Sequence, residues 1–134
     1  MRYDLSKQAR EDLLARISSH EIIAAFNLLV AGMVELGVFE FKPNINGKKK
    51  AVHFKSGRVS YFAFIANREW LLWYFRRPGV RDGIFSFDEL KSWFPKMEFS
   101  ERSDPEKTEG ILRIGSLQDA EAVMNFVRSK FGQR

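Results

Sequence analysis

The chain contains no cysteine, which removes several kinds of chemistry together. Disulfide bonds, thiolate nucleophiles and cysteine metal ligands are all excluded. No serine stands in a Gly-x-Ser-x-Gly turn, and no glycine-rich phosphate loop occurs. The sequence therefore predicts no catalytic residue, no metal ligand and no cofactor.

Long uninterrupted hydrophobic runs are also absent. The longest apolar stretch, residues 22–36, is broken by Asn27 and flanked by Glu21 and Glu35, so it is too short and too polar at its ends to span a bilayer. The N-terminal residues Met1–Asp4 lack the apolar core of a signal peptide. We expect a cytoplasmic protein that does not enter the membrane.

Acidic residues are almost missing from residues 42–81, where Glu69 is the only one. The same segment holds ten lysines and arginines and eight aromatic residues. Because the net charge of the whole chain is +5, the remainder of the protein is slightly acidic. Such an uneven charge distribution attracts polyanions.

Two helices are predicted before this segment. Residues 5–17 carry apolar side chains at helical spacing, and Ser18 and Glu21 match a capping box that opens a second helix over residues 20–36. Gly37 is a suitable left-handed terminator for that helix. The second helix is apolar nearly all round, so it must be covered on most sides. It is either the central core helix or part of a homodimer interface.

The hydrophobic period changes from 3.6 to 2 at about residue 38. The pattern predicts four strands of an antiparallel meander over residues 38–42, 51–55, 59–65 and 69–76. Turns are expected at Asn46-Gly47 and at Ser56-Gly57. The third and fourth strands are apolar on both faces over much of their length. This indicates central strands that helices cover on at least one side.

The C-terminal part predicts a helix, a strand and a helix. Ser86 and Glu89 form a second capping box for a helix that ends near Phe94, and a polar loop follows over residues 96–109. A strand over residues 111–114 precedes a last helix that Ser116 caps and Gly132 ends. The fold class is therefore α+β with the order α-α-β-β-β-β-α-β-α, and residues 1–134 form one compact domain.

The basic aromatic meander predicts a non-enzymatic module that binds nucleic acid. Cations at fixed spacing hold phosphates, and exposed aromatic rings stack on unpaired bases. We expect these side chains to converge on one surface and to contact DNA or RNA. The predicted binding residues are Lys48, Lys49, Lys50, Lys55, Arg58, Arg76, Arg77, Arg81 and Trp73.

Two other functions remain open. The same basic face could contact an acidic protein partner, as an inhibitor or accessory subunit would. Separately, Glu40 and Lys42 have the Glu-x-Lys spacing of a nuclease strand, and the element order resembles the core of the PD-(D/E)xK nucleases. That resemblance implies a metal-dependent nuclease. The family needs an Asp on the preceding strand, and the chain has no Asp between Asp12 and Asp82.

Overall fold

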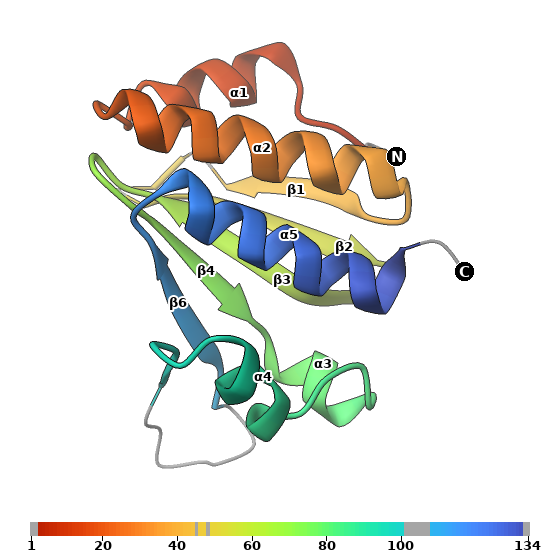
Figure 1. The fold of residues 1–134 in the computed structure, drawn as a ribbon. Helices are drawn as coiled ribbons and strands as arrows, with labels where there is room; N and C mark the ends of the chain where they lie inside the picture. Colours follow the sequence, from red (N-terminus) through yellow and green to blue (C-terminus); the bar gives the residue numbers. More distant parts are fainter. Residues whose placement is uncertain (1–2, 45, 48, 101–107, 133–134) are drawn as a thin grey trace.

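The protein folds as one antiparallel sheet with helices packed on it, which confirms the α+β class (Figure 1). The computed structural model describes residues 3–44, 46–47, 49–100 and 108–132. The helices are α1 (Lys7–Leu14), α2 (His20–Leu36), α3 (Arg77–Arg81), α4 (Phe87–Trp93) and α5 (Leu117–Phe131). The strands are β1 (Glu40–Asn44), β2 (Lys50–Ser56), β3 (Val59–Ala66), β4 (Leu71–Phe75), β5 (Glu98–Phe99) and β6 (Gly110–Ile114).

The strand order in the sheet is β1-β2-β3-β4-β6-β5, and every pair is antiparallel. The predicted four-stranded meander is therefore present as β1 to β4. The last strand, β6, pairs with β4 after the chain has passed through α3, α4 and β5. The consequence is that β3 and β4 lie in the middle of the sheet, as their apolar sequences predict.

Local side chains set the helix ends. The hydroxyl oxygens of Ser86 and Ser116 accept hydrogen bonds from the third residue beyond them, as N-caps do, and Gly37 ends α2 with a positive φ of 69°. At α2 the cap differs from the prediction by one residue. Ser19, not Ser18, accepts from the Ile22 N–H, while the Ser18 backbone N–H donates to the Arg68 carbonyl.

One face of the sheet carries the core. Rings from four neighbouring strands lie in one register row, and α2 and α5 cover them, with α1 alongside α2 (Figure 1). Edge-to-face ring pairs join the layers: Phe26 of α2 lies 5.6 Å from Phe64, and Phe126 of α5 lies 5.5 Å from Phe75, between ring centroids. The row is formed by Phe41, Phe54, Phe62 and Phe75.

The apolar helix α2 is explained by this packing. Its large apolar residues Phe26, Leu29 and Met33 are fully buried between the sheet and α5. The exposed positions of α2 are polar or small: His20, Glu21, Ala24, Asn27, Ala31 and Glu35. The core interpretation thus accounts for the pattern without a second chain, and a homodimer through residues 20–36 stays a prediction.

The structure adds two elements that the sequence pattern did not indicate. Residues 77–81 form the short helix α3, although Arg77-Pro78-Gly79 reads as a strand end and turn. Pro78 fits because it stands in the first turn of that helix, where its missing N–H costs no hydrogen bond. Residues 98–99 form β5 within the predicted loop. Among the described helices, none is long and apolar enough to cross a membrane.

Candidate functional site

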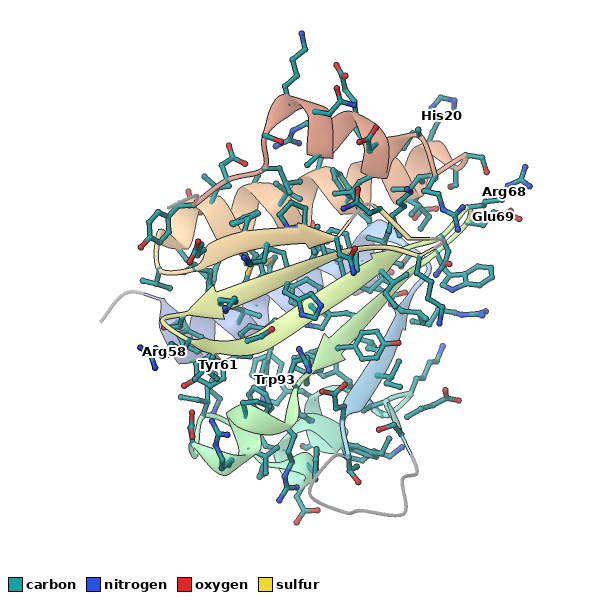
Figure 2. The ribbon with its side chains drawn as sticks, turned by 180° about the vertical axis from the view of Figure 1, so that it is seen from behind. His20, Arg58, Tyr61, Arg68, Glu69 and Trp93 are labelled. Carbon is teal, nitrogen blue, oxygen red and sulfur yellow. The ribbon has the colours of Figure 1, made fainter. Side chains whose placement is uncertain are left out.

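The opposite face of the sheet has no described helix over it, as Figure 2 shows from behind. Its side chains form two neighbouring rows across the strands. The central row is Lys42, His53, Ala63, Tyr74 and Ile111, from β1 through β6. The second row is Asn44, Ala51, Ile65, Leu72 and Arg113. We call these two rows, with the flanking Trp70 and Arg76, the open face.

The open face carries both aromatic rings and cations. His53 and Tyr74 lie on either side of Ala63, which is only 4% exposed. Toward β6, the guanidinium carbon of Arg113 lies 4.1 Å from the centroid of the Trp70 ring. This cation–π contact places the guanidinium over the face of the indole ring.

A β-bulge completes the polar end of the open face. The register shifts between Phe54 and Lys55, so that Lys55 pairs with Ser60 while Phe54 pairs with Phe62. Tyr61 is the extra residue, and its ring turns toward Phe131 of α5, 6.0 Å away between centroids. The bulge thereby brings Ser60 to the same face as His53, with 3.3 Å between Oγ and Nδ1.

Arg76 organises this polar end. Its Nε donates to Glu109 Oε2 at 2.6 Å, and its Nη1 lies 3.1 Å from His53 Nδ1 and donates to Ser60 Oγ at 3.3 Å. Burial, followed by the positive charge of Arg76, lowers the pKa of His53 below 6.5, and Glu109 opposes this shift. A neutral His53 has an unprotonated Nδ1 that accepts the hydrogen bond from Arg76.

Ser60 and His53 lie close together, but the described residues do not complete a catalytic triad with them. Glu109 contacts Arg76 and not the imidazole, so within the described part of the chain no carboxylate orients His53 as a base. In the nuclease hypothesis, Glu40 pairs in register with Lys55 on the edge of the sheet. Among the described residues, no three His, Asp or Glu side chains come close enough together to hold a metal ion.

The predicted cations lie at two ends of the sheet and not in one patch. Lys49 precedes β2 and Lys50 begins it, whereas Lys55 and Arg58 lie at its other end. Lys50 and Lys55 are separated by about 17 Å of strand at about 3.4 Å per residue. Arg76, Arg77 and Arg81 follow β4 at that second end. In Figure 2, Arg58 and Tyr61 mark this end, and Arg68 and Glu69 mark the opposite one. Lys48 lies outside the described residues.

Several of these cations already interact within the protein. Arg76 pairs with Glu109, and Arg81 pairs with its neighbour Asp82 at 3.0 Å. The guanidinium of Arg77 lies 5.6 Å from the centroid of the Phe87 ring. Lys49 and Arg58 are exposed, and Lys55 is half-buried. The charge available to a polyanion is therefore smaller than the sequence total indicates.

Trp73 cannot take the stacking role that the sequence suggested for it. Its side chain is fully buried on the covered face, with ring centroids 5.6 Å from Phe54 and 6.1 Å from Phe64. The partly exposed rings Trp70 and Tyr74 have the opposite strand parity and lie on the open face. Alternation along β4 could have grouped these two rings, but only the pairing with β6 adds Arg113 to them.

Comparison of the chain with models of protein families, with curated proteins and with solved structures gave no match.

Proposed function

We propose that this protein is a non-enzymatic module that binds single-stranded nucleic acid along the open face of its sheet. The observation that carries the proposal is the uncovered sheet face, which presents Tyr74 and Trp70 beside Lys42, Arg113 and His53. Aromatic rings on such a platform stack on unpaired bases, and flanking cations hold phosphates. The nucleic acid would run parallel to the β-strands, from the end of the sheet near Lys49 to the end near Lys55 and Arg58.

Phosphate contacts come from the ends and edges of the open face. Lys49 precedes β2 at one end, and Lys55 and Arg58 lie at the other end, with the rings between them. Lys50 has the strand parity of Val52 and Phe54, so it belongs to the helix-covered side. A chain that follows this path meets cations, then stacking surfaces, then cations. The exposed Lys42 on β1 and Arg113 on β6 flank the same path on its two sides.

The chemistry of the rings favours a single strand over a duplex. Bases within a duplex are stacked on each other and cannot lie flat on a protein ring, whereas unpaired bases can. The open face is a sheet surface without a described helix that could enter a major groove. We therefore expect a single strand to bind more tightly than its duplex of equal length.

Fluorescence anisotropy with a labelled single strand of about 16 nucleotides, the upper size of a comparable site, tests the proposal. Titrations at several salt concentrations should give a linear fall of log K with log salt, because phosphate binding releases counterions. The double variant Lys42→Ala with Lys55→Ala should bind more weakly and with a shallower slope. Its matched control, Lys7→Ala with Arg16→Ala on the helical side, removes the same charge and should bind like the wild type. Equal weakening by both pairs, or no binding at low salt, would contradict the proposal.

One observation favours a protein partner as the second candidate. The open face also carries the partly exposed aliphatic residues Ile65, Leu72 and Ile111 in adjacent strands. Such a cluster serves as the apolar centre of a protein interface with a charged rim. A partner recovered from the native host would then remain bound at high salt and be lost when Leu72 is replaced by Asp, whereas nucleic-acid binding would be weak at every salt concentration.

A further inference from the structure

A cavity of about 700 Å³ opens at the outer edge of β6, where the short strand β5 ends. The end of α4 and the residues after it form one wall, with Trp93 and Lys96, and the first half of α5 forms another, with Asp119 and Ala122. Trp93 is 44% exposed, which makes it one of the most exposed large apolar side chains in the described structure. A volume of this size lies within the usual range of sites for small ligands, roughly 300–1,000 Å³.

The edge of β6 presents one backbone donor and one acceptor to this cavity. The Ser100 N–H donates to the Glu109 carbonyl at 2.9 Å, and the Glu109 N–H donates to Ser100 Oγ at 2.9 Å, so the backbone groups of Glu109 point toward β5. Backbone direction alternates along a strand, so Ile111 and Arg113 point the same way. Ile111 is paired with Glu98, but β5 does not extend to Arg113. Within the described chain, the N–H and C=O of Arg113 therefore face the cavity without a neighbouring strand.

This edge is too short for a peptide to add as a further strand. Strand addition needs a run of backbone groups on alternate residues. On one side of Arg113, Ile111 is already paired with Glu98, and on the other the Gly115 N–H donates to Asp119 Oδ2 at 2.9 Å. Only the N–H and the C=O of Arg113 remain for a ligand. A planar ring that carries an acceptor next to a donor on one edge can pair with both.

We propose that this cavity binds the base of one nucleotide, with its edge on the backbone of Arg113 and its ring beside Trp93. Nucleobases carry donors next to acceptors on their edges, and their flat faces stack on aromatic side chains. Lys96 and the side chain of Arg113 supply cations for the attached phosphate. Glu98 and Asp119 also line the cavity, and their carboxylates accept hydrogen bonds from amino groups of a base.

The cavity is continuous with the surface proposed to bind the strand. Leu72, Ile111 and Arg113 line the cavity and also belong to the two rows of the open face. A strand that runs over the open face can therefore place one unstacked nucleotide in the cavity at the β6 edge. This inference rests on the proposed function, and it adds a site that binds one of the four bases more tightly than the others.

The test uses the full chain, labelled with ¹⁵N, and each of the four 5′-mononucleotides in turn. We expect one of them to shift the Arg113 amide and the Trp93 indole N–H resonances together. The variant Ala122→Leu extends the α5 wall into the cavity and should weaken this binding at least tenfold. Ala24→Leu, at an exposed position of α2, makes the same substitution in a helix and should change nothing. Lys96→Glu, at an exposed site, is a second variant that should weaken binding without affecting the fold.

Homopolymeric single strands separate this inference from the proposed function. If the wild type binds all of them equally and no mononucleotide shifts the two resonances, the base site is refuted while binding along the open face stands. If no single strand binds but a mononucleotide does, the base site stands and the proposed function fails. A short apolar peptide that shifts the same two resonances, when no nucleotide does so, would overturn the base site in favour of peptide binding.

Discussion

Arg76 and Glu109 form an ion pair with 2.6 Å between Nε and Oε2, across the end of β4 and the residue before β6. Both side chains are largely buried, with 28% of Arg76 and 13% of Glu109 exposed. The same guanidinium contacts His53 and Ser60, so Arg76 ties three strands of the open face together. The Arg76 charge is therefore paired within the fold, and the negative charge of Glu109 weakens the attraction of Arg76 for a phosphate.

Replacement of Glu109 by Gln should increase the affinity for single strands. Gln keeps an acceptor for Arg76 but removes the negative charge, so the guanidinium can contact a phosphate. One additional phosphate contact steepens the slope of log K against log salt by about 0.7. The free energy of unfolding should fall by about 1 kcal/mol, because a charge-assisted hydrogen bond becomes a neutral one. Salt titrations and urea unfolding measure the two effects. Glu11→Gln, exposed on α1, is the control, and an unchanged slope for Glu109→Gln would contradict the expectation.

Replacement of Tyr74 by Leu should weaken single-strand binding with little change in stability. Loss of a stacked base costs about 1–3 kcal/mol, which corresponds to about a fivefold to 150-fold rise in Kd. The β-strand position is kept apolar, so we expect a Tm close to that of the wild type. Tyr3→Leu removes an exposed ring outside the sheet and should leave the affinity unchanged. A fall in Tm with unaltered binding would instead assign Tyr74 a structural role.

The pH dependence of stability should carry a contribution from His53. Because its pKa is lowered in the folded protein, the unfolded chain takes up a proton first as the pH falls through about 6.5. The contribution of His53 to the free energy of unfolding is fully present above pH 6.5. It is lost as the pH falls toward the pKa of His53 in the folded protein, by at most about 1.4 kcal/mol per pH unit. His53→Gln keeps an acceptor for Arg76 and should remove this slope. Urea unfolding of both proteins between pH 5 and 8 measures the difference, and parallel curves would contradict the expectation.

Replacement of Gly79 by Ala should destabilise the fold. Gly79 in α3 is buried, and a Cβ there would collide with the ring of Phe85, which is itself held in the core. Overpacking of this kind costs about 1–3 kcal/mol. Gly47→Ala is the matched control, since a Cβ at that exposed position meets no atom within 4 Å. Thermal unfolding of the two variants checks the difference, and similar Tm values would show that Phe85 can move aside.

Most local signals of the sequence were confirmed because they act within a few residues, although Ser19 and not Ser18 caps α2 and residues 77–81 form a helix and not a turn. Ser86 and Ser116 cap their helices, Gly37 ends α2, and Gly57 turns the chain between β2 and β3 with a φ of 66°. Alternating apolar residues placed the four strands of the meander to within about two residues. Periodicity did not decide which side of β4 faces the helices, because Leu71–Phe75 are apolar on both sides. The sequence therefore predicts Trp73 as a binding residue, whereas the structure buries Trp73 and places Tyr74 on the open face.

The sequence by itself determined the class of the fold, the order of its main elements and the concentration of positive charge in the meander, since these depend on composition and short-range pattern. Only the tertiary structure decided how that charge is used. The pairing of β6 with β4 brings Arg113 to Trp70 and Glu109 to Arg76, over separations of 43 and 33 residues along the chain. The bulge at Tyr61 turns Ser60 toward His53. Such long-range pairings and a one-residue register shift arise from packing of the whole sheet, which no local pattern encodes.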